Sequence, residues 1–108
     1  MSLEISGYQF EGPYSIDTTV ISSNRAAVYV IICKTPDGKN HVTDVGESGE
    51  VGVRIGNHDR RPCWETNCNG SLFVYLRYMP SSDGYTATDR REIENKIRNQ
   101  YNPPCGKK

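Results

Sequence analysis

The sequence predicts a small mixed α/β (α+β) domain, built from a three-stranded antiparallel sheet flanked by helices. Three segments carry the β-branched and aromatic residues that are typical of strands, namely 27–33, 41–46 and 71–79. The C-terminal segment instead repeats its apolar residues every four positions, as a helix packed on a sheet does. The expected order along the chain is hairpin, short helix, strand and long helix.

The chain of 108 residues fits one domain. Its composition, 35% hydrophobic and 24% charged, is too apolar for a disordered protein. No apolar run approaches the ~20 residues of a membrane span. The N-terminus shows no cationic region followed by an apolar stretch. We therefore expect a cytoplasmic domain that makes no membrane contact.

The net charge is zero but unevenly distributed. Residues 1–24 hold three acids and no Lys or Arg, so residues 25–108 carry all 13 basic residues against ten acids, a balance of +3. This small excess mildly favours a polyanionic partner, but on charge alone it fits an ordinary solvated surface at least as well. The polar segment 1–24 is expected to be an extended arm that packs on a domain of residues 25–108, with 7–10 as a candidate short strand.

The first two predicted strands form a hairpin. Residues 27–33 are an unbroken apolar run, which should be buried on both faces of a sheet. A Pro-Asp-Gly turn follows at 36–38, and residues 41–46 alternate as the second strand. The apolar residues of 49–57 recur at every second position but also four apart, so strand and helix both fit this segment.

The second half of the domain is expected to hold a loop, a strand and a helix. Residues 58–70 have the composition of a loop, and residues 71–79 that of the third strand. After a turn at 80–84, Thr86 or Thr88 is expected to cap the last helix. The residues that form its apolar stripe and then end it are Ile93, Ile97, Tyr101 and Pro103-Pro104.

The four cysteines are Cys33, Cys63, Cys68 and Cys105. We expect them to be reduced, because the sequence shows no secretory leader. Cys33 lies in the apolar run and is expected in the core. The alternative is a zinc-stabilised structural module, whose ligands would be His58, Cys63, Cys68 and Cys105. The spacing between Cys63 and Cys68, wider than in most zinc knuckles, weighs against it.

One constellation of residues stands out. Tyr29 lies in the first strand, and Gly46 ends the second strand. Arg54 and His58 follow four residues apart, a spacing that places them on one face of a helix. Glu94 lies in the last predicted helix. This pattern resembles the GIY-YIG nuclease superfamily, which is named for two tripeptides on neighbouring strands.

The resemblance covers roughly residues 25–106. Ala27-Val28-Tyr29 is similar to the first tripeptide and keeps its tyrosine, whereas Asp44-Val45-Gly46 is similar to the second and keeps its glycine. The resemblance also favours a helix over a strand at 50–58. The further matches are Arg54 for the helix-borne arginine, His58 for a frequent His or Tyr, and Glu94 for the metal-binding glutamate.

The resemblance implies a metal-dependent endonuclease that hydrolyses the phosphodiester bonds of nucleic acids, with DNA as the expected substrate. Glu94 would hold one Mg²⁺ or Mn²⁺, mostly through water. Arg54 would grip the scissile phosphate with its forked guanidinium. Tyr29, assisted by His58, would act as general base or position the attacking water. Gly46 would let the strand end approach the site closely.

Each of these residues also has a purely structural explanation. Glu94 has arginines four and three residues before it and four residues after it, which suits a ladder of salt bridges along a helix. Tyr29 suits a core or cross-strand position. His58 suits the end of a helix, and Arg54 a solvated surface.

Two positions depart from the family pattern. Asp44 stands where the family has a tyrosine, and it would serve as a carboxylate ligand or base, or else mark an inactive site. Gly106 stands three residues after Pro103, where the family often has an asparagine that supports the site by hydrogen bonds. Both departures favour the alternative function, a catalytically inactive domain of the same fold that binds nucleic acid or a protein.

Further candidate contacts to nucleic acid are Arg60, Arg61, Arg77 and Trp64. Trp64 is expected in the core rather than at the surface, because it is the single tryptophan and a short chain needs apolar volume. Arg60 and Arg61 equally fit a polar turn.

Overall fold

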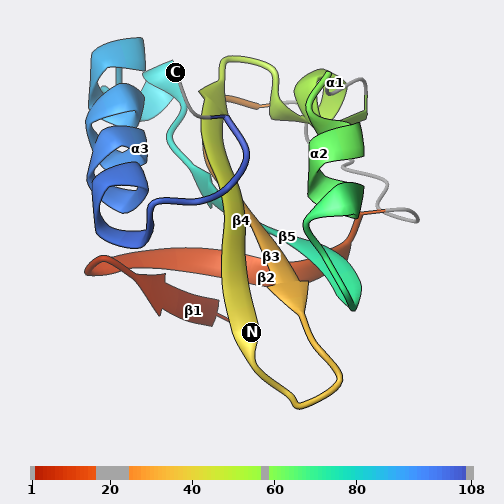
Figure 1. Ribbon diagram of the computed structural model, residues 1–108. Helices are drawn as coiled ribbons and strands as arrows, with labels where there is room; N and C mark the ends of the chain where they lie inside the picture. The colour runs from red at the N-terminus through yellow and green to blue at the C-terminus, as the bar shows by residue number, and fades with distance from the viewer. Residues whose placement is uncertain (1, 17–24, 57–58, 107–108) are drawn as a thin grey trace.

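The computed structural model describes residues 2–16, 25–56 and 59–106 (Figure 1). Five strands form one antiparallel, curled sheet in the order β1-β2-β5-β3-β4. The strands are β1 (Ser2–Ile5), β2 (Tyr8–Ser15), β3 (Ala27–Lys34), β4 (Asn40–Ser48) and β5 (Ser71–Tyr78). The helices are α1 (Val51–Gly56), α2 (Arg61–Thr66) and α3 (Ala87–Tyr101), with a 3₁₀ turn at Ser81–Asp83.

The predicted three-stranded sheet is wrong, although the domain remains mixed α/β. Residues 2–15 form the hairpin β1–β2, and β2 pairs with β5 so that the sheet gains two strands. Ile5 and Phe10 anchor this hairpin, since both side chains are buried in the core. The composition concealed these strands because β2 buries one residue of its eight, and its pairing is made by the backbone rather than by an apolar pattern.

Strand β3 lies between β5 and β4, and residues 27–33 are all buried, as the apolar run predicted. Because alternate side chains of a strand point to opposite faces, β3 contributes to two cores. Tyr29 and Ile31 pack with residues of α1 and α2, whereas Val28 and Val30 pack with residues of α3. Accordingly, α3 and the pair α1–α2 lie on opposite sides of the sheet (Figure 1).

Helices α1 and α2 follow one another between β4 and β5. The helix predicted within 50–58 is confirmed by α1, but the loop predicted at 58–70 is wrong where residues 61–66 form α2. Pro62 lies in the first turn of α2. Backbone N–H groups in this turn have no partner within the helix, so the helix loses no hydrogen bond by having a proline there. None of the helices in the described part of the chain has the length and apolar content to cross a membrane.

Helix α3 begins with a reciprocal pair of hydrogen bonds. The Thr86 hydroxyl accepts from the Asp89 backbone N–H, and the Asp89 carboxylate accepts from the Thr86 N–H, which together form a capping box. Of the two predicted caps, Thr86 is therefore the one confirmed. Ile93 and Ile97 are buried as expected, but Tyr101, the last residue of the helix, is 43% exposed.

The prediction of reduced cysteines is wrong. Cys33 is bonded to Cys68 and Cys63 to Cys105, with Cα–Cα distances of 5.6 and 5.9 Å. No cysteine in the described ranges is free, so the zinc alternative loses its thiolates, and His58 lies outside the described residues. These pairs are 35 and 42 residues apart along the chain, and a linear spacing cannot show which distant thiols meet. The core position of Cys33 is confirmed.

Candidate functional site

The carboxylate of Asp44 is the centre of a polar cluster beside the edge strand β4. Its side chain is completely buried. It accepts hydrogen bonds of 2.7 Å from Arg60 Nε, 2.7 Å from Trp64 Nε1 and 2.8 Å from the Val45 backbone N–H. Buried carboxylates need such partners, because an unpaired one would lose its hydration without compensation. Asp44 therefore fastens α2, through Arg60 and Trp64, to β4.

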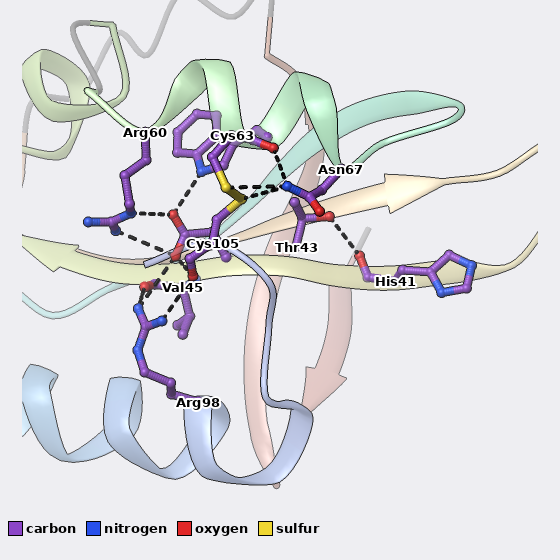
Figure 2. The surroundings of a disulfide bond; sticks show 10 residues. His41, Thr43, Val45, Arg60, Cys63, Asn67, Arg98 and Cys105 are labelled. Atoms are coloured by element: carbon purple, nitrogen blue, oxygen red, sulfur yellow. Dashed lines mark hydrogen bonds and ion pairs between the residues drawn. A yellow bond between two sulfur atoms is a disulfide. The ribbon is translucent and has the colours of Figure 1, made fainter. Parts of the chain in front are cut away.

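Arg98 reaches the same carboxylate from the other side of the sheet. Its guanidinium lies 3.4 Å from Asp44 Oδ1 and also donates to the carbonyl oxygens of Val45 and Cys105 (Figure 2). Cys105 in turn donates its backbone N–H to Thr43 O at 3.1 Å. The C-terminal segment thus covers part of the free edge of β4, where unpaired backbone groups would otherwise be exposed.

Tyr29 lies on β3 directly opposite Gly46 of β4. The phenol lies over this glycine so closely that a Cβ at position 46 would overlap the phenol oxygen. Burial raises the pKa of Tyr29, while the charges of Arg60 and Arg54 partly offset the rise. The Arg54 guanidinium also donates a hydrogen bond to the phenol. At neutral pH the phenol is therefore protonated, and it is buried rather than open to solvent.

Arg54 and Arg60 converge on this phenol from separate segments. Arg54 belongs to α1, and its side chain is 37% exposed and 3.4 Å from Asp59. Arg60 precedes α2, and its side chain is 28% exposed. Burial by itself lowers the pKa of Arg60, but the hydrogen bond and charge of Asp44 outweigh it and raise the pKa overall. Both guanidiniums are charged and partly accessible to solvent.

Five of the predicted site positions thus meet. Tyr29, Asp44, Gly46, Arg54 and Arg60 lie together on the side of the sheet that α1 and α2 cover. The sequence suggested Asp44 as a ligand or base, but in the structure two arginines and an indole share its carboxylate.

Glu94 is held by a different set of contacts. It belongs to α3, and its carboxylate lies 3.4 Å from the Arg98 guanidinium, which stands between Glu94 and Asp44. Arg90 pairs with Glu47 of β4 instead, at 2.9 Å. Arg98 is therefore the salt-bridge partner of Glu94, at the i,i+4 spacing that the structural explanation for Glu94 expects.

The residues present do not fit the Mg²⁺ or Mn²⁺ that the resemblance implies. A divalent cation at Glu94 would lie beside the positive Arg98 guanidinium, and Asp44 is already shared by two arginines. Within the described residues, no group of three or more His, Cys, Asp or Glu side chains could hold a metal ion. No step through a metal is derived from this arrangement.

The other predicted contacts are spread over the domain. Arg61 lies 4.0 Å from Glu65 on α2. Arg77 donates to Gln9 O at 3.2 Å and belongs to β5 rather than to the Asp44 cluster. Trp64 has no exposed surface, which confirms the core position and excludes stacking on a base in this conformation. His58 lies outside the described residues.

Two features of the site were not predicted, namely Arg98 and the role of Gly106. Gly106 has a φ of 77°, and a Cβ there would approach Asp44 Oδ1 to 2.7 Å and Arg98 Nη1 to 2.9 Å. Glycine is therefore required where the family pattern would have an asparagine side chain. The one signal in the sequence was Pro103-Pro104, which ends the helix and lets the chain return to β4.

In comparisons with protein-family models, with curated proteins and with solved structures, none matched this chain. The relationship to the GIY-YIG superfamily therefore stays a prediction that rests on the residues named above. Function has to be argued from the geometry of the Asp44 cluster and its neighbours.

Proposed function

We propose that this domain binds the phosphate groups of nucleic acids at a site formed by the guanidiniums of Arg54 and Arg60, here called the arginine site. The observation that carries the proposal is that both guanidiniums are partly exposed, while Asp44 holds that of Arg60 and Asp59 lies 3.4 Å from that of Arg54. Two charged, forked donors of this kind complement a phosphodiester, which presents two anionic oxygens. The arrangement supports binding of a nucleic-acid backbone and involves no base-specific contact.

The contacts behind the arginine site favour a fixed geometry. Asp44 holds Arg60 by a 2.7 Å hydrogen bond, so that part of the guanidinium is oriented before any ligand arrives. Arginine suits this role because its planar fork matches a phosphate and its charge persists at all relevant pH values. A preoriented donor loses less conformational freedom on binding and so binds more tightly.

The proposal does not include hydrolysis. Metal-dependent cleavage remains a prediction from the resemblance, and the contacts of Glu94 and Asp44 do not fit a divalent cation. The proposed domain is therefore the binding alternative, active without metal. It makes few phosphate contacts, so its affinity should be moderate and should fall as the salt concentration rises.

Fluorescence anisotropy with labelled single-stranded DNA, duplex DNA and RNA, in the presence of EDTA, tests this proposal. We expect Arg54→Gln and Arg60→Gln to weaken binding at least about tenfold, since a charge-assisted hydrogen bond contributes at least about 1.5 kcal/mol. The matched control is Arg91→Gln, which removes the same charge from α3, where the side chain is 63% exposed. Equal affinity in all four proteins, or no binding by the parent chain, would contradict the proposal.

A cleavage assay decides between binding and hydrolysis. Supercoiled plasmid, single-stranded DNA and RNA are incubated with Mg²⁺ or Mn²⁺ and with the parent chain or Glu94→Ala. The proposal expects no cleavage by either protein. Cleavage that disappears in Glu94→Ala would establish the nuclease prediction and would show that Arg98 gives way to a metal ion.

The cellular compartment in which this domain works decides whether its two disulfides persist. Disulfides in a cytosolic protein are usually transient, and serve catalysis or redox sensing. Lasting disulfides would fit an oxidising compartment, whereas the predicted cytoplasmic location fits bonds Cys33–Cys68 and Cys63–Cys105 that open and close. Counting free thiols in protein trapped with an alkylating reagent at cell lysis tests this directly.

A further inference from the structure

Both disulfides converge on one short segment, residues 60–68. Cys63 lies within α2, and Cys68 lies two residues beyond its end. The first is bonded to Cys105 in the C-terminal segment and the second to Cys33 at the end of β3. The same segment carries Arg60 of the arginine site and Trp64, both of which are bound to Asp44.

Helix α2 has little stability of its own. It has six residues, fewer than an isolated helix needs in water. Its N-cap residue, Arg60, makes no capping hydrogen bond with its side chain. The segment is therefore held by its tertiary contacts, which are the burial of Trp64, the hydrogen bonds to Asp44 and the two disulfides.

We propose that the redox state of Cys33–Cys68 and Cys63–Cys105 controls phosphate binding, because the two bonds hold α2 and with it Arg60 in the arginine site. This inference rests on the proposed function. With both bonds intact, Arg60 donates a 2.7 Å hydrogen bond to Asp44, and its guanidinium is preoriented. With the bonds open, no covalent link ties α2 to the sheet. The six-residue helix then depends on the burial of Trp64 and the hydrogen bonds to Asp44 alone, and Arg60 samples other positions.

The chemical step is thiol–disulfide exchange with a dithiol reductant. One thiolate of the dithiol attacks a sulfur atom of the protein disulfide, and the other protein sulfur leaves as a thiolate and takes up a proton. The second thiolate of the dithiol then displaces the remaining protein sulfur. Each disulfide gains two electrons and two protons to give two thiols, and the dithiol becomes a cyclic disulfide.

The single tryptophan reports the movement of α2 independently of any ligand. Trp64 is completely buried, its indole N–H donates to Asp44, and its neighbour in sequence is Cys63. We expect dithiothreitol to shift Trp64 emission to longer wavelength as the indole becomes hydrated. Circular dichroism in the far ultraviolet should retain the signal of the sheet. Unchanged emission after four thiols have appeared would overturn the proposal.

Binding of fluorescein-labelled single-stranded DNA measures the second half of the inference. We expect about a tenfold weaker Kd for the reduced chain than for the oxidised chain, the loss predicted for a misplaced Arg60. Equal Kd values in the two states would overturn the proposal. If the oxidised chain binds no DNA, the proposed function fails, whereas an emission shift would still show that α2 responds to reduction.

Paired substitutions keep the test valid if the fully reduced chain unfolds. Cys63→Ser with Cys105→Ser removes the bond next to Asp44, and Cys33→Ser with Cys68→Ser removes the bond at the end of β3. Each double variant retains the other disulfide. We expect the first pair of substitutions to weaken DNA binding more. Cys63 lies between Arg60 and Trp64 in the sequence, and both of these residues donate hydrogen bonds to Asp44. No loss of affinity in either pair would overturn the proposal.

Discussion

The indole Nε1 of Trp64 donates a 2.7 Å hydrogen bond to the buried carboxylate of Asp44, and so joins α2 to the edge strand β4. The two residues are 20 positions apart in the sequence. Arg60 and Arg98 complete the surroundings of the carboxylate from α2 and α3, on opposite sides of the sheet. A single acidic side chain thereby connects the edge of the sheet to both helical layers.

Replacing Asp44 with Asn should destabilise the domain strongly. The substitution removes the negative charge but leaves Arg60 and Arg98 facing one another, and breaking a buried pair in this way costs about 3–5 kcal/mol. Urea unfolding with both disulfides intact measures the free energy of unfolding. The control is Asp83→Asn, which is exposed and should change that free energy by less than about 0.5 kcal/mol. A loss below about 1 kcal/mol for Asp44→Asn would contradict the central role of this carboxylate.

Replacing Gly46 with Ala should force Tyr29 out of its place. The added Cβ would overlap the phenol oxygen, and overpacking of this kind costs about 1–3 kcal/mol. Gly49→Ala is the matched control, because a Cβ there would meet nothing within 4 Å. Combining Gly46→Ala with Tyr29→Phe should recover part of the loss, which a double-mutant cycle of unfolding free energies would show. Purely additive effects would mean that the two residues do not collide.

Replacing Arg54 with Gln should raise the pKa of Tyr29 further. Burial already raises this pKa above 10.0, and the hydrogen bond and charge of Arg54 oppose the rise. Because the folded pKa exceeds the unfolded one, the associated stability is present below pH 10 and is lost as the pH increases. The variant should therefore lose stability more steeply above pH 10 than the parent chain.

Ultraviolet absorbance of ionised tyrosine, followed alongside unfolding at each pH, checks this expectation. Tyr29→Phe identifies which part of the titration belongs to Tyr29. Arg61→Gln serves as the charge-matched control, since Arg61 lies beside Glu65 on α2. A lower pKa for Tyr29 in Arg54→Gln would refute the contact between the guanidinium and the phenol.

Replacing Thr86 with Ala should cost about 1 kcal/mol of stability, because it removes the cap of α3 and one half of the capping box. Thr88→Ala offers the matched comparison, since Thr88 is exposed inside the first turn and alanine is the better helix former there. Chemical denaturation measures the free energy of unfolding of both variants, and only Thr86→Ala should lower it. Equal losses would show that the helix does not depend on Thr86.

The local pattern of the sequence determined several elements. The unbroken apolar run at 27–33 predicted the buried strand β3, and the Thr86 cap with the Ile93–Ile97 stripe predicted α3. These features depend on neighbours within a few residues, and local patterns record such interactions well. The expectation for Trp64 followed from size and composition, and its burial agrees with it.

Local sequence patterns did not predict the hairpin β1–β2. Its residues are mostly polar. It is held by the buried side chains of Ile5 and Phe10 and by backbone bonds to β5, more than 50 residues further along the chain. Helix α2 escaped prediction for a related reason, because six residues with one buried side chain carry too little periodicity to be recognised.

The sequence by itself determined a mixed α/β domain with a central apolar strand, and its resemblance to the GIY-YIG superfamily singled out Tyr29, Asp44, Gly46 and Arg54 as candidate site residues. Only the tertiary structure decided the five-stranded sheet, the pairing of the cysteines and the partners of Asp44. The physical reason is that each of these depends on contacts between segments far apart in the chain. Backbone pairing, disulfides and shared carboxylates leave no periodic trace along a sequence.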